Sequence, residues 1–467
     1  MAIAAALAVA VAPRSAGANG AFPDSLQILL PRDAPRRIIF STNFGLVISN
    51  DDGVTWSWTC EQPNTTGGFL YQIGAPPDDN LYAVAAPGLA FSTDGSCTWE
   101  LSKGRLDNAV ATDAFTHPTD PSQVLAIAVE LGPGDLPYGI YRSTDGGRTF
   151  GPPIYSAPAG GGLLGVEIAR SDPRIITLAM FEPPGIRPRL VRSVDDGATW
   201  APPLDLEPQL GPNWFSIVAV DPRDAMTIYF RVTEPEGETL GITRDGGVTI
   251  TKPVMFADRM TGFVQLPSGT ILVAGFSGGA PVGFRSIDGG KTFTVWDNVP
   301  GVRALGERAG KLFVLGDNFV DKFALAVSTD EGMTLEPVTT FSKISSINAC
   351  AKSTCQMSCD SIADRFMIWS NDMCRTDGGV AGADTSDGGG APPNDGSPKA
   401  RTDAGGGAGC GCAAAGAGGE FSAAAALAAL AALLVARRRR CATTAGGIPV
   451  VAQRATAEGR WLVWRRP

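Results

Sequence analysis

Short hydrophobic runs separated by polar turns recur along most of the chain. Residues 69–92, 166–180, 215–232 and 262–276 each contain an apolar run, a turn rich in Pro, Asp or Gly, and a second apolar run. Short runs bounded by such residues are typical of β-strands rather than helices. A third run, such as residues 45–49, ends at a Ser or Thr. The pattern therefore predicts an all-β chain.

An eight-residue segment, here called a box, begins at the last residue of seven of these third runs. Each box has Ser or Thr first, Asp third and Thr seventh, usually with Gly fifth and an aromatic or apolar residue last. Asp accepts backbone N–H groups within its own turn and Gly adopts positive φ, so each box predicts a hairpin turn into a fourth strand. The seven aspartates are Asp51, Asp94, Asp145, Asp195, Asp245, Asp288 and Asp330.

The spacing of the boxes indicates how the strands are organised. Successive aspartates are 43, 51, 50, 50, 43 and 42 residues apart. A period in the forties, with four strands per repeat, is typical of propeller blades. We therefore predict a closed seven-bladed β-propeller of four-stranded antiparallel blades over residues 21–349. Residues 25–31 and 342–349 are both candidates for the inner strand that closes the ring, and the sequence leaves this choice open.

The boxes resemble the Asp-box (BNR) repeat, S-x-D-x-G-x-T-W, of sialidases, photosystem assembly factors, sortilin-like modules and other propellers. The resemblance covers residues 24–349, with departures at Ser96, Ile250 and Leu335. It implies that the boxes lie on the outer rim, away from the axial face that binds ligands. The box aspartates are then expected to be structural, and we assign no catalytic, cofactor-binding or metal-binding residue.

The charge balance bears on the class of partner. Residues 24–349 contain 37 acidic and 24 basic residues, a net charge of −13, whereas the whole chain has −9. An acidic propeller without basic clusters indicates that nucleic acid is not a partner. Phosphate-binding and dinucleotide-binding motifs are absent, so no cofactor is expected. We expect a monomer.

The N-terminus predicts export. Residues 1–20 form a predicted signal peptide, with an apolar stretch at 2–12 and small residues at 16–18 that suit cleavage. An Ala-rich disordered start is the alternative.

The cysteines predict disulfides, in agreement with export. Cys60 and Cys97 would fall on neighbouring blades, so we expect them to pair. Cys350, Cys355, Cys359 and Cys374 lie in residues 350–375, a predicted helical cap. Zinc is one possibility for these four, but no paired C-x-x-C or His is present; two disulfides within the cap are the favoured interpretation.

The C-terminal region predicts a membrane anchor. Residues 376–409 are rich in Gly, Ala and Asp, which predicts a flexible, disordered linker. Residues 421–436 form a predicted transmembrane helix, about 24 Å long against a core of ~30 Å. Within residues 410–440, this helix is flanked by Cys410 and Cys412 on one side and by Arg437, Arg438, Arg439 and Arg440 on the other.

This order of Cys motif, apolar helix and Arg cluster resembles the myxobacterial C-terminal sorting tail. The resemblance implies processing by a dedicated membrane protease and display at the cell surface. The basic extension of residues 441–467 departs from that family, whose tails end soon after the arginines. A displaced stop or a short cytoplasmic tail would each account for it.

Two classes of function remain, a glycoside hydrolase and a non-catalytic binding propeller. A sialidase needs an arginine triad that begins in an F/Y-R-I-P motif, whereas Arg36 and Arg37 are followed by Ile-Ile-Phe; sialidases also have six blades. Other glycosidases need two facing carboxylates, which the sequence cannot single out. His117, the one histidine, is expected in a surface turn rather than in a Ser-His-Asp triad.

We therefore expect a non-catalytic propeller that binds a protein, peptide or glycan through its axial face, with a glycoside hydrolase as the alternative. Residues 129–139, 181–189 and 232–241 lie in the longer repeats. They predict long loops that build one side of the binding surface, although simple length variation would also explain them.

Overall fold

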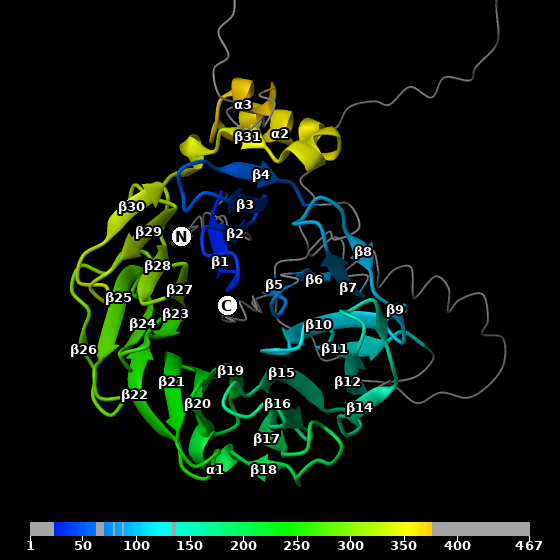
Figure 1. Cartoon of the computed structure of the whole chain (residues 1–467). Helices are drawn as coiled ribbons and strands as arrows, with labels where there is room; N and C mark the ends of the chain where they lie inside the picture. Colours follow the sequence, from blue (N-terminus) through cyan, green and yellow to red (C-terminus); the bar gives the residue numbers. More distant parts are fainter. Residues whose placement is uncertain are drawn as a thin grey trace, which may run out of the picture. The chain divides into compact units, whose positions relative to one another are not determined.

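The computed structural model describes residues 23–61, 70–77, 80–85, 88–107, 109–132 and 137–375. These residues form a ring of seven antiparallel blades, each containing four strands in chain order from the centre outward (Figure 1). The predicted fold class is confirmed. The predicted signal peptide, linker, anchor helix and basic extension lie outside the described residues.

The strands of the first three blades occupy residues 25–156. Blade 1 contains β1 (Ser25–Leu29), β2 (Ile38–Thr42), β3 (Gly45–Ser49) and β4 (Ser57–Thr59); blade 2 contains β5 (Leu70–Ile73), β6 (Leu81–Ala85), β7 (Gly88–Ser92) and β8 (Glu100–Leu101). Blade 3 contains β10 (Ala109–Thr116), β11 (Val124–Glu130), β12 (Tyr138–Ser143) and β14 (Pro153–Ser156). Between blades 2 and 3, β9 (Lys103–Gly104) pairs in parallel with β13 (Thr149–Phe150).

The remaining four blades follow in the same order. Blade 4 contains β15 (Gly162–Ile168), β16 (Ile176–Glu182), β17 (Arg187–Ser193) and β18 (Leu204–Asp205); blade 5 contains β19 (Trp214–Asp221), β20 (Asp224–Glu234), β21 (Gly237–Thr243) and β22 (Thr251–Phe256). Blade 6 contains β23 (Arg259–Gln265), β24 (Ile271–Ser277), β25 (Ala280–Ser286) and β26 (Thr294–Val295); blade 7 contains β27 (Ala304–Arg308), β28 (Lys311–Leu315), β29 (Leu325–Ser328) and β30 (Glu336–Thr339). The short helix α1 (Glu207–Leu210) precedes blade 5.

The hydrophobic core lies between neighbouring blades. Every residue of β2 and β3 is buried, because both faces of a blade pack against another blade. Tyr229 of blade 5, for example, packs against Phe263 of blade 6, with ring centroids 4.8 Å apart and the rings tilted by 42°. Two-sided burial explains why these strands are nearly continuous hydrophobic runs rather than strictly alternating ones.

The seven boxes form the same turn. In blade 3, Ser143 Oγ donates to Asp145 Oδ1 (2.7 Å), while Thr149 donates to the same carboxylate from its N–H (2.8 Å) and its hydroxyl (2.6 Å). The fourth and fifth residues, Gly146 and Gly147, have φ of 73° and 83°. Equivalent Thr-hydroxyl bonds lower the pKa of Asp245 and Asp330 to about 2. Each box carboxylate is thus occupied by donors of its own turn.

A side chain of the preceding blade also holds several of these turns. The partner is the fourth residue of the next box in each case, which has positive φ: Tyr82 with Gly146, Arg142 with Asp196, Arg244 with Gly289, and Arg285 with Glu331. Neighbouring blades are therefore joined by polar contacts as well as by the core.

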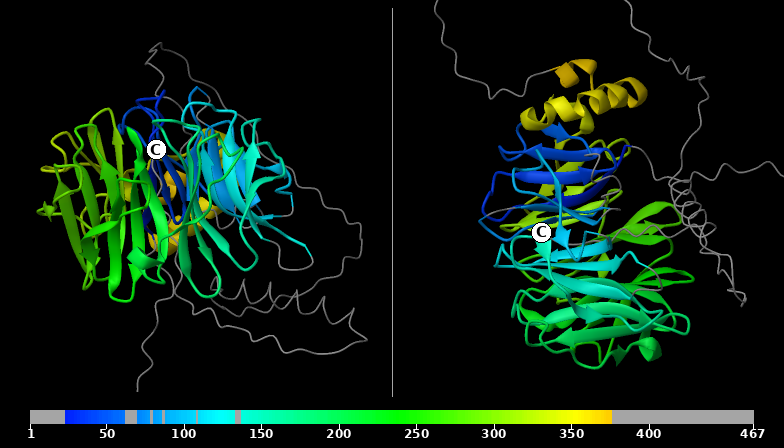
Figure 2. Two further views of the ribbon diagram at one scale, coloured as in Figure 1. Left: turned by 90° about the horizontal axis from the view of Figure 1, so that it is seen from below. Right: turned by 90° about the vertical axis from the view of Figure 1, so that its right-hand side faces the viewer.

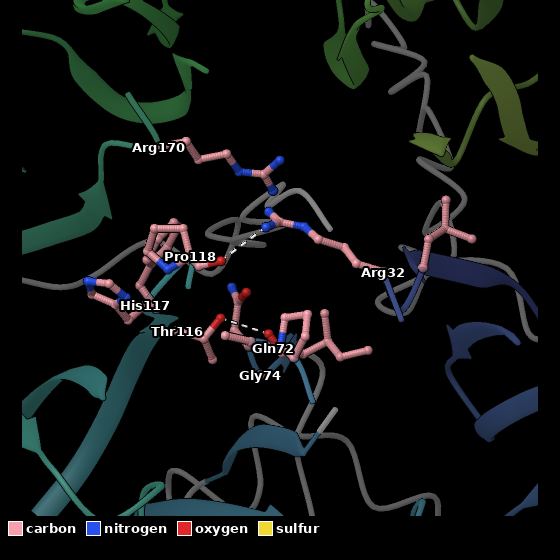
Figure 3. A pocket seen from close by; sticks show the side chains of 12 residues that line it. Arg32, Gln72, Gly74, Thr116, His117, Pro118 and Arg170 are labelled. Carbon is pink, nitrogen blue, oxygen red and sulfur yellow. Dashed lines mark hydrogen bonds between the residues drawn. The ribbon is translucent and has the colours of Figure 1, made fainter. Parts of the chain in front are cut away.

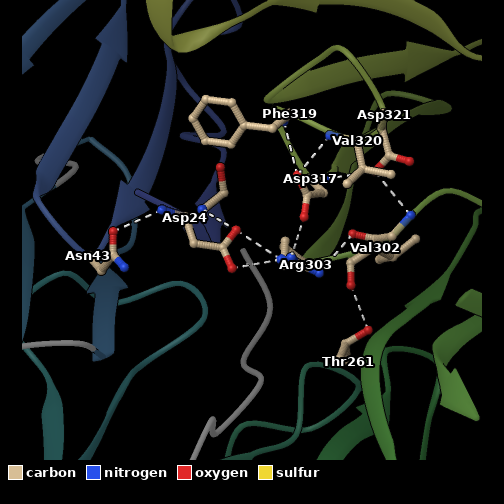
Figure 4. Close-up of polar contacts among 11 residues, drawn as sticks. Asp24, Asn43, Thr261, Val302, Arg303, Asp317, Phe319, Val320 and Asp321 are labelled. Atoms are coloured by element: carbon tan, nitrogen blue, oxygen red, sulfur yellow. Dashed lines mark hydrogen bonds and ion pairs between the residues drawn. The ribbon is translucent and has the colours of Figure 1, made fainter. Parts of the chain in front are cut away.

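The ring closes between blades 7 and 1. Of the two candidate closing segments, the first forms the innermost strand β1. The second instead forms a 3-10 turn, Phe341–Lys343, and β31 (Ser346–Ile347), which pairs in parallel with β4 on the outer edge of blade 1. At the seam, Arg303 donates from Nε to Asp24 (2.8 Å) and from Nη2 to Asp317 (2.9 Å) (Figure 4).

A small helical cap follows β31. It begins with a 3-10 turn, Ala349–Ala351, and continues with α2 (Lys352–Phe366) and α3 (Asn371–Arg375), which lie beside blade 1 (Figure 2). Trp369 of the cap packs against Trp58 of β4, with ring centroids 5.2 Å apart. The cap thus shares a hydrophobic core with blade 1.

The disulfides differ from the predicted pairing. Cys60 pairs with Cys355 and Cys97 with Cys350, while Cys359–Cys374 is the one bridge within the cap. The predicted Cys60–Cys97 bond is wrong, as is the prediction of two bridges inside the cap. The physical reason is that β31 carries the cap back to the outer edge of blade 1, beside blade 2, so that Cys60 of blade 1 and Cys97 of blade 2 meet cap residues about 250 to 300 positions away.

Three disulfides indicate an oxidising, extracellular environment. Within the described part of the chain, the structure contains no helix with the length and apolar character needed to cross a bilayer.

Candidate functional site

The two ends of the ring carry different loops. Strands within a blade are antiparallel, so the loop after the first strand lies at the same end as the box after the third. Backbone hydrogen bonds connect them: the Asp52 N–H donates to Arg36 O (2.7 Å) and the Asp196 N–H to Arg174 O (2.8 Å). We call this end of the ring the box end, and the other the opposite end.

A pocket lies at the box end, in blades 1 to 4. Its lining comes from the segments where the first strand of each of these blades ends: Leu30 and Arg32, Gln72 to Pro76, Phe115 to Pro118, and Arg170. The cavity has a volume of about 40 Å³, whereas pockets that enclose a whole small molecule measure about 300 to 1,000 Å³. It therefore has room for one chemical group of a larger ligand.

Two exposed arginines flank the pocket. Figure 3 shows the side chains of Arg32 and Arg170 turned toward each other from opposite sides. Arg32 donates from Nη1 to the carbonyl of Pro118 (3.0 Å), which links the end of the first strand of blade 1 to that of blade 3. None of the lining residues in the described part of the chain is acidic.

Beneath the arginines lies the amide of Gln72. This side chain is 3% exposed, and its Nε2 has no hydrogen-bond acceptor among the described residues. Figure 3 shows the amide directed toward the space between the two arginines. A buried donor without a partner costs about 1 to 3 kcal/mol, so an acceptor from a ligand would be favourable here.

His117 lines the same pocket but is not arranged as a general base. Its Nδ1 accepts the N–H groups of Thr119 (3.2 Å) and Asp120 (2.9 Å), so this nitrogen carries no proton. A catalytic triad needs an Nδ1–H that donates to a carboxylate. Burial lowers the pKa of His117 further. The expected turn is present, but the histidine is buried rather than on the surface.

At the opposite end, the longer repeats extend strands rather than loops. In blade 5, β20 continues to Glu234 and β21 starts at Gly237, leaving a two-residue turn. In blade 4, β16 and β17 pair as far as Glu182 and Arg187. The expected long loops are thus absent from residues 181–189 and 232–241. The remaining segment, 129–139, lies only partly within the described residues.

Charged groups at the opposite end are paired with one another. Arg189 binds Glu182 (2.9 Å) and also Asp205, and Lys252 binds Glu234 (2.7 Å). At the seam, burial raises the pKa of Asp24, although Arg303 opposes the shift. Within the described ranges, no group of three or more His, Cys, Asp or Glu side chains is placed to hold a metal ion.

Of the pocket residues, sequence reasoning singled out only His117. Arg36 and Arg37, which it compared with a sialidase motif, do not line this pocket. Arg32, Gln72 and Arg170 belong to no motif. Their common feature is a position at or just after the end of the first strand of a repeat, which an internal alignment of the repeats would reveal.

No protein-family model and no curated protein sequence matches this chain. Several solved structures do match. A mutant puromycin hydrolase shares 14% identity over 68% of this chain and 53% of its own, with a TM-score of 0.50. YCF48 from Cyanidioschyzon merolae shares 16% sequence identity over 65% of this chain and 94% of its own, with a TM-score of 0.45. The GH74 xyloglucanase from Xanthomonas campestris shares 14% sequence identity over 67% of this chain and 58% of its own, with a TM-score of 0.35.

This chain spans only 58% and 48% of the first two structures that it matches, both GH74 proteins. At these identities, the likeness shows the propeller fold alone. A propeller ring is compatible with binding and with catalysis.

Proposed function

We propose that this protein is an exported, surface-anchored propeller of the Asp-box type that binds a protein, peptide or glycan without converting it. The observation that carries this proposal is the composition of the pocket at the box end, where the innermost strands end, although the Asp-box resemblance implied a ligand face away from the boxes. Two arginines and a buried amide donor meet there, and among the described residues no carboxylate or tyrosine lines the cavity. These groups can hold a ligand, but they include no nucleophile paired with a base.

Export and anchoring are supported by separate features. Three disulfides favour an extracellular location. Cys410, Cys412 and the arginines of residues 437–440 flank the apolar segment 421–436, an order that favours a membrane anchor with its arginines in the cytoplasm. We propose that a sorting protease processes this tail and leaves the propeller on the cell surface.

A reporter fusion tests the anchor. Residues 376–467 are fused to a secreted fluorescent protein, and a second fusion carries Ala at positions 437–440. The first fusion should remain with the cell envelope, whereas the second should be released to a greater extent. Release of both into the medium, as freely as the reporter without a tail, would contradict the anchoring proposal.

Binding and turnover assays test the function. The full chain is assayed on a fluorogenic sialoside, on xyloglucan and on an array of glycans and peptides. We expect saturable binding to a member of the array, with the bound molecule recovered unchanged. Replacement of Arg32 by Met should weaken this binding, whereas Arg36→Met, which changes an exposed arginine outside the pocket, should not.

A glycoside hydrolase is the second candidate, favoured by the cluster at the ring seam. Asp24 and Asp317 contact the same arginine, Arg303, and burial raises the pKa of Asp24. A carboxyl group with a raised pKa next to a second carboxylate is the pattern of a glycosidase acid and its partner. Turnover of a sialoside or polysaccharide that Asp24→Asn abolishes, in a variant with unchanged thermal stability, would establish this alternative.

A further inference from the structure

We infer that the Cys97–Cys350 disulfide is a modification site, at which a small polar thiol becomes bound to Cys97 and Cys350 is released as a free thiol. The inference goes beyond the proposed binding function and does not depend on it. It follows from three observations: the exposure of this bond, the depression beside it, and the different surroundings of its two sulfur atoms.

The Cys97–Cys350 bond is the most accessible of the three disulfides in the described part of the chain. Cys350 is exposed and Cys97 is half-buried. Both partners of the other two bonds are buried, with at most 6% of any of these residues exposed. A thiolate must reach a sulfur atom to attack it, and exposed disulfides are typically the labile ones. An external thiol should therefore open the Cys97–Cys350 bond first.

An open depression borders Cys97, beside the box turns of blades 1 and 2 and the segment that follows β31. Its volume is about 400 Å³, within the range of pockets that hold a small molecule. Polar side chains supply much of its lining: Asn50, Thr93, Asp94 and Asn348. The depression therefore has room for the polar substituent of a small thiol whose sulfur is bound to Cys97.

The surroundings of the two sulfur atoms favour Cys350 as the leaving group. Cys350 lies two residues before α2, whose first turn, all within the described residues, contains no acidic side chain. The N-terminus of a helix stabilises a negative charge, and a thiol with a lower pKa leaves faster. Cys97 instead follows Asp94 in the same turn, and this carboxylate disfavours a thiolate at Cys97.

The reaction is a single step of thiol–disulfide exchange. The thiolate of the small thiol attacks Cys97 Sγ and forms a new S–S bond. The Cys97–Cys350 bond breaks, and its electron pair leaves with Cys350, which takes a proton from water; no further oxidant or reductant is required. The cap remains on blade 1, because the Asn348 N–H donates to Trp58 O (2.8 Å) and the Cys60–Cys355 bond is untouched.

Peptide mapping by mass spectrometry tests the inference on the full chain. The oxidised protein is incubated with L-cysteine, and free thiols are trapped with N-ethylmaleimide at intervals. We expect L-cysteine on Cys97 and N-ethylmaleimide on Cys350. These products should form at least about tenfold faster than any product of the two buried disulfides, because the buried sulfur atoms are not accessible.

Equivalent box positions provide a test of the depression with a matched control. Thr93 and Thr144 are both exposed and are the second residues of the boxes in blades 2 and 3. Thr93→Trp should fill the depression and slow the modification of Cys97. Thr144→Trp places the same side chain on another blade and should leave the rate unchanged.

Two exposed serines of α2 test the leaving group. Ser353→Glu places a carboxylate in the first turn of the helix and should slow the exchange by about twofold or more. Ser361→Glu introduces the same charge farther along the helix and should have a smaller effect. Thermal melts of these and the threonine variants separate a change in reactivity from a loss of folding.

Several outcomes would overturn the inference. Similar rates for all three disulfides would show that exposure does not select this bond, and addition of L-cysteine to Cys350 would contradict the assignment of the modified residue. An unchanged rate in Thr93→Trp would exclude the depression, and equal effects of the two serine variants would exclude the helix terminus. Binding on the glycan and peptide array tests the proposed function separately, so the two can fail independently.

Discussion

Arg142 of blade 3 forms a two-pronged ion pair with Asp196, the fourth residue of the box in blade 4. Its Nη1 lies 3.0 Å from Asp196 Oδ2 and its Nη2 lies 2.8 Å from Oδ1, and Nη2 also donates to the Asp196 carbonyl (2.8 Å). Asp196 has a φ of 58°, a conformation that L-residues rarely adopt. The contact therefore holds a strained turn against the neighbouring blade.

Loss of this contact should destabilise the ring. We expect Arg142→Met to lower the free energy of unfolding by about 1 kcal/mol, since the pair is partly exposed and screened. Urea denaturation measures the change. The matched control is Arg174→Met, which removes an exposed pair with Asp172 inside one loop and should have a smaller effect. An equal loss of unfolding free energy in the two variants would show that the contact between blades contributes no more to stability than the exposed pair within one loop.

In the box of blade 3, the fifth residue is a glycine that we expect to tolerate no side chain. Gly147 has a φ of 83°, and a Cβ built at this position lies 2.6 Å from Cε1 of Tyr82. We expect Gly147→Ala to reduce stability by about 2 kcal/mol or more, through backbone strain and this clash. Thermal melts followed by circular dichroism measure the change.

Ser96 occupies the same position in the box of blade 2 and provides the reverse test. It adopts a φ of 80°, and its hydroxyl lies 3.3 Å from Thr59 Oγ1. Because Gly adopts this φ without strain, we expect Ser96→Gly to preserve stability or to raise it by up to about 1 kcal/mol. A clear loss of stability would mean that the hydroxyl contact outweighs the strain.

The disulfides should attach the cap to two different blades. Non-reducing peptide mapping should recover peptides that link Cys60 to Cys355 and Cys97 to Cys350, and none that links Cys60 to Cys97. In the double variant Cys60→Ser/Cys350→Ser, both bridges are lost, and amide exchange should accelerate in β31 and β4, which pair under the cap. Unchanged exchange there would show that packing alone holds the cap.

Glu61 should make stability dependent on pH. Burial raises its pKa from 4.5 to about 7. Because the folded state favours the protonated acid, its contribution is fully present below about pH 4.5 and is lost as the pH rises through 7. The rise in pKa corresponds to at most about 3.4 kcal/mol. We expect Glu61→Gln to melt at a higher temperature than the natural chain at pH 8, with the difference disappearing at pH 4. Parallel melting curves across this range would contradict the prediction.

The turns and the number of blades were predictable because their causes are local. In each box, the partners of the aspartate lie within four residues of it, as for Ser143, Asp145 and Thr149. A turn with such partners forms from its own short segment, and its repetition at 42 to 51 residues determines how many four-stranded units the chain contains. The two-sided burial of the strands is likewise encoded in continuous hydrophobic runs.

The tertiary structure alone decided which distant residues meet. Ring closure and the parallel pairing of β31 with β4 brought Cys355 to Cys60 across 295 residues, and no spacing rule in the sequence anticipates that pairing. The pocket likewise combines Arg32, Gln72 and Arg170, which lie on different blades and belong to no motif. Local hydrogen bonds follow from neighbouring residues, whereas these contacts depend on the curvature and closure of the ring as a whole.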